Sequence, residues 1–530
     1  MTPRTRTLVR MGVAGAVVTF LCIGVLFVFA VPPFVPADES SHAGYALRVT
    51  DGEIPNVDEL VEVQLPGQRP TRYFTANHPP LYYVVAGPIL RWGRDSGHPY
   101  AGIRLTRGLS VALGAAAVAL AALFAGTVLR GFRTGERRRS EAMVLVAGLV
   151  ATVPTYVFTA SFVHNDMLAV ATLVLAYVGA AAALVDRPTR WNVAAVAIGS
   201  GLTMATRFSG LGIVALCCGA LACAGLWRTT GSTRRRVLNA AGLALVPVAT
   251  VLVTSGWFYL RNKREYGDFA GINGNLEFLH RVDKYTPWSY LTDRLSLPDL
   301  FVRTENAGGW ASLPYFGWYE RKVLAVVVAV VAVGAVLAMV RLVRERQPFG
   351  GWSADRLSQL ALVGFVVAMP LVAWVQLAGF VSQTGAPHPR YMFGVLPAIA
   401  LGVALAVMAF RGRWGAMVGA AIVGIQAAIT VMTVGRWIRV RTGVEPVHPL
   451  TELRDALGAG GIGRPRAVLG LLLLGALVGL ALQVVALWRL SSSEPSGDSE
   501  AEDAEPDDRD IATNTAQAAA TAPVGTAGIT

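Results

Sequence analysis

The chain has 530 residues, of which 54% are hydrophobic and only 15% are charged, and its formal net charge is +12. Soluble domains carry about 25% charged residues, and apolar runs of a length that spans a bilayer recur along most of this chain. The composition therefore excludes a soluble protein and indicates an integral membrane protein. The positive charge does not indicate nucleic-acid binding, because the arginines lie in short loops between apolar runs, where the positive-inside rule places them.

The apolar runs predict an all-α polytopic fold with about twelve transmembrane helices. The first run is too long for the core of a signal peptide and no small-residue cleavage site follows it, so we expect a retained anchor. The expected spans are 8–31, 104–129, 142–161, 164–185, 192–206, 208–226, 237–259, 321–341, 357–381, 391–410, 415–435 and 466–488.

The distribution of arginine predicts the orientation. With the N-terminus inside, five basic segments fall on the cytoplasmic side, as the positive-inside rule requires: 4–10, 130–139, 228–236, 341–346 and 411–413. The long loops 32–103 and 260–320 are then extracytoplasmic, and so is the basic segment 436–465, against the rule. All seven histidines lie on or near this face. We therefore expect any chemistry on the extracytoplasmic side of the plasma (inner) membrane.

Two regions are expected from composition: a membrane-embedded domain over 1–490 and a cytoplasmic tail over 491–530. The tail contains nine acidic residues against Arg509 alone and shows no apolar periodicity, which predicts disorder. The four cysteines all fall inside apolar runs, so neither a disulfide framework nor a metal cluster is expected from them.

The first long loop opens with two adjacent acidic residues. Asp38 and Glu39 follow the exit of the first helix from the membrane, and His42 comes three residues later. A carboxylate that is partly desolvated at such an interface is suited to general-base work. The same carboxylates could instead cap a helix that ends near Val49. The residues alone do not decide between the two roles.

Further along this loop, His78 begins a His-Pro-Pro-Leu run, and a short apolar stretch follows to Trp92. That stretch is too short to span and has aromatic ends, which favours a helix lying in the membrane interface. Arg107 then stands near the outer mouth of the second spanning helix, where it could snorkel to headgroups or hold the phosphate of a lipid-linked substrate. His42 and His78 could suggest zinc, but no third ligand follows at usable spacing. We expect no metal and no cofactor.

Ionisable residues also lie near the ends of several apolar runs. Asp166 and Arg207 are functional candidates by their position, but they could equally pair as a structural strut. At the exit of the seventh helix, an arginine could line the acceptor side or act as a stop-transfer residue. The remaining possible substrate-lining residues are His164, Asn165, Arg261 and Asn262.

The order of these motifs resembles the protein O-mannosyltransferase and aminoarabinose transferase families of the GT-C superfamily. The runs DESSH (38–42), HPPLYY (78–83) and RGLSVALG (107–114) look like the start of such an enzyme. Later runs follow in the family's order: SFVHNDMLA (161–169), TRFSGL (206–211), WFYLRNKREYGD (257–268) and PHPRYMFGVLPAIAL (387–401). Ala76 stands where the mannosyltransferases usually have an acid, so the chain is closer to the loosely characterised bacterial branch.

The resemblance implies a membrane glycosyltransferase of the hexosyltransferase type. It would transfer a sugar, mannose by default, from a polyprenyl-phosphate carrier to an extracytoplasmic glycan, lipid or protein acceptor, with inversion. Asp38 would deprotonate the acceptor hydroxyl, with Glu39 and His42 in support. The implied phosphate-binding residues are Arg107 and Arg390, with Tyr391 beside them.

Other functions stay open on the sequence. A transporter or lipid flippase would use Asp166 and Arg207 as a coupling pair, but it would not explain why polar residues gather in the outer loops. A polysaccharide polymerase or ligase also acts outside, and a non-catalytic scaffold needs no site at all. The partners expected are membrane lipid and a lipid-linked sugar, and no nucleic acid.

Overall fold

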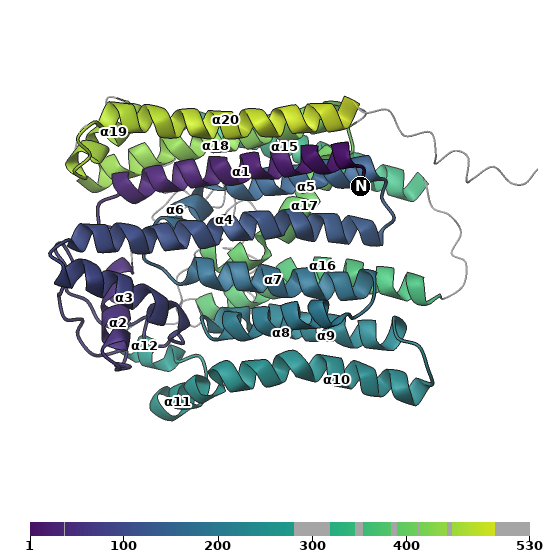
Figure 1. Ribbon diagram of the computed structural model, residues 1–530, viewed down its shortest axis with the longest axis horizontal. Helices are drawn as coiled ribbons and strands as arrows, with labels where there is room; N and C mark the ends of the chain where they lie inside the picture. Colours follow the sequence, from purple (N-terminus) through teal and green to yellow (C-terminus); the bar gives the residue numbers. More distant parts are fainter. Residues whose placement is uncertain are drawn as a thin grey trace, which may run out of the picture. The chain divides into compact units, whose positions relative to one another are not determined.

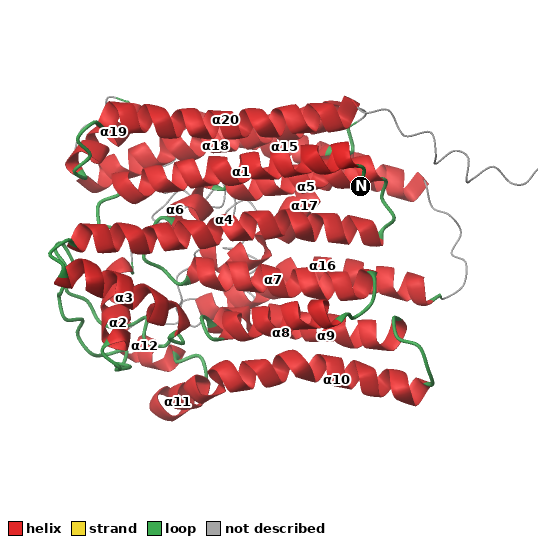
Figure 2. Ribbon diagram, in the orientation of Figure 1, coloured by secondary structure: helices red, strands yellow, loops and turns green. Residues whose placement is uncertain are grey.

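The computed structural model describes residues 1–36, 38–279, 318–344, 353–382, 389–410, 413–442 and 448–492. The chain divides into two compact units, Met1–Ser491 and Ser492–Thr530, and the helix bundle is the first of them. Within the described ranges every regular element is a helix, apart from one isolated β-bridge between Leu60 and Arg72. Figure 2 shows this helical content. The predicted tail from 493 on and the second long loop from 280 to 317 lie outside the described residues.

The helices begin and end close to the predicted boundaries. They are α1 (Pro3–Ala30), α2 (Glu39–Thr50), α3 (Leu81–Asp95), α4 (Pro99–Gly131), α5 (Glu136–Ala151), α6 (Pro154–Ala160), α7 (Asp166–Val185), α8 (Arg190–Met204), η1 (Phe208–Gly210), α9 (Leu211–Trp227), α10 (Thr233–Val251), η2 (Leu252–Gly256), α11 (Trp257–Tyr266), α12 (Ile272–Leu279), α15 (Trp318–Arg344), α16 (Ala354–Ser382), η4 (Pro389–Val395), α17 (Leu396–Val407), α18 (Arg413–Thr442), α19 (Pro449–Ala459) and α20 (Pro465–Ser492).

In the described part of the chain, nine helices are long and apolar enough to cross a membrane, or ten if α5 and α6 form one bent span. The other two predicted spans correspond to α8, which has only 15 residues, and to α15, in which Val326–Ala338 is the apolar stretch. Fifteen residues make a helix of about 23 Å, shorter than the hydrocarbon core. The prediction of an all-α polytopic membrane protein is confirmed.

The break between α5 and α6 matters for the site. The two helices meet at 64°, with Pro154 as the first residue of α6. Proline has no N–H to continue the hydrogen bonding of α5 and its ring clashes with a preceding turn, so the helix ends there and restarts in a new direction. The short α6 then ends at Ala160, inside the bundle, and the turn that follows carries His164 and Asp166.

The two ends of the helix bundle differ in character. In Figure 1 the spans lie side by side, with the N-terminus at one end and α2, α3, α11, α12 and α19 gathered at the other. Ion pairs join helix ends near the N-terminus, where Glu136 binds the terminal amine (3.1 Å) and Arg130 binds Asp186 (2.7 Å). These pairs place the basic stretch that contains Arg130 at the same end as the N-terminus.

The helices of the first loop are held against that opposite end by close packing. On α3, Gly87 faces the carbonyl of Ala46 on α2 so closely that a side chain there would collide with it. From α4, the guanidinium of Arg104 donates to the carbonyl of Gly460, directly after α19. The segment that contains α19, whose side was a weak point of the topology prediction, thus lies at the same end as the first loop.

Candidate functional site

Asp38 immediately precedes α2 and has a left-handed backbone, with φ of 73°. Non-glycine residues rarely adopt this region, and Asp is among those that tolerate it best. Its side chain makes no capping bond to α2 within the described structure; Oδ2 instead accepts a hydrogen bond from Arg390 Nη2 at 2.6 Å. The carboxyl and guanidinium side chains are 23% and 18% exposed. Of the two roles left open by the sequence, side-chain capping is not the one adopted.

Arg107 has a different environment, because its guanidinium is fully buried. It binds Glu39 through Nε (2.8 Å) and Nη2 (2.7 Å), and its other N–H groups donate to the carbonyls of Val28, Val31 and Pro32. Carbonyls at the end of a helix have no partner within the helix, so Arg107 completes the end of α1. All five of its donors are used, and the predicted phosphate contact of Arg107 is therefore corrected to a structural role.

Glu39 is as fully engaged as its partner. Besides binding Arg107, it accepts the backbone N–H of Phe34 at 2.8 Å and that of Val163 at 3.0 Å. The side chain has no exposed surface. A carboxylate with four donors and no solvent contact holds α1, α4 and the turn before α7 together. Glu39 thus holds the segments around Asp38 in place, which is an indirect form of the support that the sequence analysis expected.

Three histidines lie together beside Asp38. The ring of His42 is 4.0 Å from that of His164 and 6.5 Å from that of His78, and its Nδ1 is 2.8 Å from the hydroxyl of Tyr83. Burial lowers the pKa of His42 to about 3 and holds the pKa values of His78 and His164 well below the usual value. All three rings are consequently neutral near pH 7. No group of three metal-ligating side chains in the described ranges is arranged to hold a metal ion.

His164 connects the two arginine–aspartate pairs of the site. Its Nδ1 is 3.2 Å from Asp166 Oδ2, and its Nε2 is 3.3 Å from Arg390 Nη1. Asp166 in turn forms an ion pair with Arg207. The five side chains make a continuous series, which we call the ion-pair series: Arg207, Asp166, His164, Arg390 and Asp38. The strut that the sequence left open for Asp166 and Arg207 is present, and it belongs to the site.

The turn before α7 is fixed in place by its own hydrogen bonds. Asn165 is fully buried and donates from Nδ2 to the carbonyl of Thr206 at 3.2 Å, which joins this turn to the end of α8. Nearly two turns into α7, Thr172 bonds Thr203 at 2.9 Å. Asp166 occupies the first position of α7, where the helix dipole favours a negative charge. These contacts between α7 and the end of α8 hold Asp166 beside the segment that carries Arg207.

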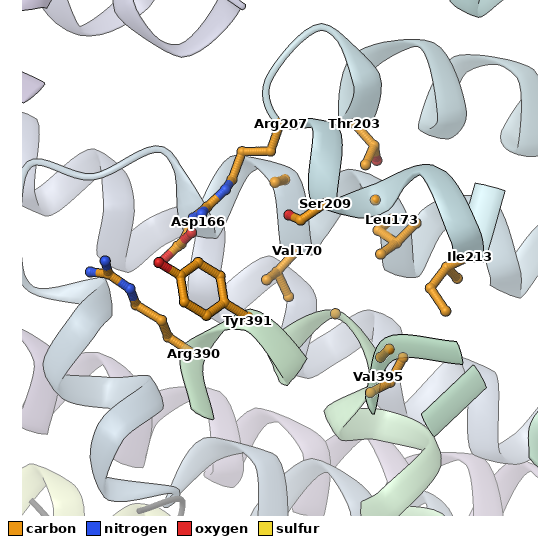
Figure 3. Close-up of a pocket in the computed structure, with 14 residues that line it drawn as sticks. Asp166, Val170, Leu173, Thr203, Arg207, Ser209, Ile213, Arg390, Tyr391 and Val395 are labelled. Atoms are coloured by element: carbon orange, nitrogen blue, oxygen red, sulfur yellow. Dashed lines mark ion pairs between the residues drawn. The ribbon is translucent and has the colours of Figure 1, made fainter. Parts of the chain in front are cut away.

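Tyr391 lies beside both arginines of the series. The guanidinium carbons of Arg207 and Arg390 are each 5.4 Å from the centre of its ring, and Phe380 packs edge-on against it. Figure 3 shows its ring directed towards Asp166 and Arg207. Stacking of this kind holds a guanidinium in a defined plane, so the tyrosine orients both cations towards the same space.

A cavity of about 40 Å³ adjoins these residues, with polar and apolar walls at opposite ends. Asp166, Arg207, Arg390 and Tyr391 gather at one end in Figure 3. The apolar wall is formed by side chains of α7, α9 and η4: Val170, Leu173, Ile213 and Val395. Such a volume holds a few water molecules.

Some polar atoms around this cavity are buried without a hydrogen-bond partner among the described residues. They include Nε of Arg207, Nε of Arg390 and Oδ1 of Asn165. A buried donor left unsatisfied costs about 1–3 kcal/mol, and more when it is charged. Unsatisfied guanidinium donors at the edge of a cavity are therefore suited to receive an anion.

Arg261 and Asn262, which the sequence placed on the acceptor side, make their contacts with the first loop. Arg261 Nη2 donates to the carbonyl of Pro55 and to Oδ1 of Asn56, both at 3.1 Å. Asn262 Nδ2 donates to the carbonyl of Asn77 at 3.0 Å. They fasten α11 to the loop rather than joining the ion-pair series.

Sequence reasoning missed two tyrosines. Tyr82 bonds Ser110 at 3.1 Å and accepts the backbone N–H of His164 through its hydroxyl, and Tyr83 bonds His42. Both are fully buried on α3. The signal was the HPPLYY run itself, where adjacent tyrosines in a loop helix with polar neighbours indicate hydrogen-bonded burial.

No family model and no curated protein matches the chain. Among solved structures, it is similar to ArnT from Cupriavidus metallidurans in the apo state, with a TM-score of 0.44 and 18% identity over 88% of this chain and 75% of that one. It is also similar to the oligosaccharyltransferase AglB from Archaeoglobus fulgidus in complex with an inhibitory peptide and a dolichol-phosphate, with a TM-score of 0.36 and 12% identity over 94% and 59%.

A further structure of an Archaeoglobus fulgidus oligosaccharyltransferase, in complex with Zn and sulfate, matches with a TM-score of 0.34 and 13% identity over 93% of this chain and 56% of that one. The chain spans just over half the length of these oligosaccharyltransferases. The function is therefore inferred from the side chains of the site.

Proposed function

We propose that this protein transfers a sugar from a polyprenyl-phosphate carrier to an acceptor hydroxyl on the extracytoplasmic face of the plasma membrane. The observation that carries the proposal is a pair of cations, Arg207 and Arg390, at the polar end of a cavity whose other end is apolar, with the partly exposed carboxylate of Asp38 paired to Arg390. The sugar is mannose by default, from the resemblance of the motifs.

The lipid carrier determines where the reaction must take place. Each buried CH₂ of a polyprenyl chain contributes about 0.8 kcal/mol to partitioning, so the carrier stays in the bilayer. Its phosphate must therefore react at the level where the spans end. Asp38 and Arg390 lie there: Asp38 follows α1, and Arg390 is in the turn before α17.

The charge change of the reaction explains the need for two arginines. Transfer of the sugar converts a phosphodiester monoanion into a phosphomonoester with a charge near −2. Arg390 and Arg207, which both lie beside Tyr391, would bind this developing charge, with Arg207 taking the part that the sequence assigned to Arg107. Charge-assisted hydrogen bonds to a leaving phosphate stabilise the transition state more than the ground state.

Asp38 would accept the proton of the acceptor hydroxyl. With the base and the phosphate on opposite sides of the sugar, direct displacement inverts the anomeric centre. His42 and His164 are neutral, so they place no positive charge beside Asp38 in competition with Arg390, and their two rings lie 4.0 Å apart.

The proposal is tested by incubating membranes that contain the protein with radiolabelled polyprenyl-phosphate mannose and following the label into lipid, glycan and protein fractions. Label that moves covalently to an acceptor supports a transferase. Label that crosses the membrane while still on its carrier would instead favour a flippase. A panel of polyprenyl-phosphate sugars extends the test if mannose is not the donor.

A further inference from the structure

A second hollow lies between α19 and the start of α20, away from the ion-pair series. It is a groove of about 300 Å³. Two arginines line it, Arg454 from α19 and Arg466 from α20. Its other lining residues are mostly apolar: Leu450, Thr451, Leu469, Gly470 and Leu473. In Figure 1, α19 and the start of α20 lie at the end of the bundle that carries the helices of the first loop.

The bilayer supplies the surroundings of this groove. α20 is long and apolar enough to cross a membrane, and only 22% of the residues in its apolar stretch are buried inside the protein. Leu473 in the groove is followed one turn later by Leu477, which is exposed. Because α20 runs through hydrocarbon, its exposed apolar side chains contact lipid chains. An occupant of the groove therefore has an apolar chain that continues along α20.

The polar part of the groove is positively charged, because two arginines line it and no acidic residue does. Arg454 pairs with its neighbour Asp455 at 2.6 Å, but that carboxyl is 62% exposed, and an ion pair in contact with solvent contributes little. Arg466 is exposed and has no carboxylate partner among the described residues. The head of the occupant is therefore an anion.

The position of these arginines in the bundle gives a second reason to expect an anion. Arg454 belongs to the basic segment 436–465, which the predicted topology places outside, against the positive-inside rule. The contact between Arg104 and the carbonyl of Gly460 joins this segment to the end that carries the first loop. Guanidinium groups bind phosphate bidentately, and phosphate headgroups are the anions that a bilayer offers where a span begins.

We propose that the groove between α19 and α20 binds an anionic phospholipid, with the headgroup phosphate on the two arginines and an acyl chain along Leu469, Leu473 and Leu477. Basic pockets between membrane helices bind anionic headgroups in this way. A zwitterionic lipid fits less well, because its own cation lies close to the guanidinium groups. The inference goes beyond sugar transfer and does not depend on it, since the groove and the cavity beside Tyr391 share no lining residue.

The test is photo-crosslinking of the full chain in phosphatidylcholine nanodiscs that contain a small fraction of a lipid with a photoreactive acyl chain. Two probes are compared, phosphatidylglycerol and phosphatidylcholine, which differ only in the headgroup. Labelled peptides are identified by mass spectrometry. One arginine near an anionic lipid favours binding by about five-fold and two by about thirty-fold. We therefore expect phosphatidylglycerol to label the peptides of 449–477 about five- to thirty-fold more than phosphatidylcholine does.

The charge of the groove is tested by replacing both arginines. Arg454→Gln together with Arg466→Gln should remove the preference for phosphatidylglycerol. The matched control is Arg187→Gln together with Arg190→Gln, which removes two exposed arginines near the connection of α7 to α8 and should leave the preference unchanged. A preference that survives the loss of Arg454 and Arg466 would overturn the inference.

A steric variant keeps every charge and decides the question if the charge variant folds poorly. No atom lies within 4 Å of the place where a Cβ at Gly470 would stand, so Gly470→Phe is accommodated and its ring fills the groove. Labelling of 449–477 by phosphatidylglycerol should then fall about five-fold or more. Gly364→Phe, at an equally open glycine of α16, is the control. Undiminished labelling in Gly470→Phe would show that the lipid lies elsewhere.

The remaining outcomes distinguish the phospholipid from the sugar carrier. An excess of polyprenyl monophosphate should leave the labelling of 449–477 unchanged, because the proposed ligands of its phosphate are Arg207 and Arg390. Loss of the label would assign the groove to the carrier and overturn the inference, and so would equal labelling of the wild type by both probes. A protein that shows the phosphatidylglycerol preference but transfers no sugar would contradict the proposed function alone.

Discussion

Two adjacent acidic residues, Asp38 and Glu39, each pair with an arginine, and the two pairs differ in burial and in the hydrogen-bond donors that they leave unused. Glu39 and Arg107 have no exposed charge, and every donor and acceptor direction that they offer is filled. Asp38 and Arg390 are partly exposed, and Arg390 keeps an Nε without a hydrogen-bond partner in the described structure. A saturated buried pair cannot take a substrate without losing its own bonds. A pair with spare donors at a cavity can.

The largest effect on sugar transfer is expected from a substitution in the partly exposed pair of Asp38 and Arg390. Asp38→Asn keeps the size of the side chain but removes the proton acceptor, so sugar transfer should fall by about 10²–10⁴-fold. The rate is measured in membranes with the labelled donor, at matched protein levels and beside Asp95→Asn, which breaks an exposed pair with Arg94 (2.7 Å). Transfer above about a tenth of the wild-type rate would contradict the role of Asp38 as base, since a missing base predicts at least a 10²-fold loss.

A substitution in the buried pair of Glu39 and Arg107 should instead lower the stability of the protein. Arg107→Ala leaves Glu39 charged, buried and unpaired, which typically costs about 3–5 kcal/mol, on the order of the whole stability of many domains. We expect a low yield of folded protein and a much lower unfolding temperature in detergent. Replacing both residues, with Glu39→Leu and Arg107→Met, should recover part of the loss because no lone charge remains. A stable Arg107→Ala protein that binds donor poorly would reverse the distinction between the pairs.

The buried histidines beside Asp38 and Arg390 predict that the stability of the protein depends on pH. The folded pKa of His42 is about 3, well below that of an unfolded histidine, so the unfolded chain binds more protons once the pH falls below about 6.5. Stability is therefore highest above that pH and is lost as the pH falls towards 3, by up to ~1.4 kcal/mol per pH unit for each such histidine. Unfolding temperatures between pH 8 and 5 test this, with His98→Ala, which replaces an exposed histidine before α4, as control. A flat profile would mean that the rings are accessible to protons.

The smallest effect concerns α11. Arg261→Met removes the bonds to Pro55 and Asn56, so stability should fall by about 1–2 kcal/mol while transfer stays within a few-fold of wild type. Unfolding temperature and transfer rate are measured on the same preparation. A large rise in the KM for the acceptor, without loss of stability, would instead support the expectation from sequence that Arg261 lines the acceptor side.

Much of the architecture was predictable from sequence because hydropathy is a local property. Each expected span has a helix at its position, and the helix α3 after the His-Pro-Pro-Leu run was also expected. The break at Pro154 was not, because 142–161 was expected as a single span. The number of helices that cross the membrane could not be predicted in this way. α8 has only 15 residues, and whether so short a helix crosses the membrane depends on the helices that pack around it.

The candidate residues were also visible in the sequence, since ionisable groups near the ends of apolar runs are rare and costly. Their partners were not. Glu39 meets an arginine 68 positions away and Asp38 meets one 352 positions away. Spacing cannot tell which guanidinium reaches which carboxylate, because that depends on how the spans pack and on which carbonyls a helix end leaves open. The sequence by itself determined the membrane fold and the list of charged groups at one end of it. Only the tertiary structure decided that Arg107 is enclosed by the end of α1 while Arg390 and Arg207 border a cavity.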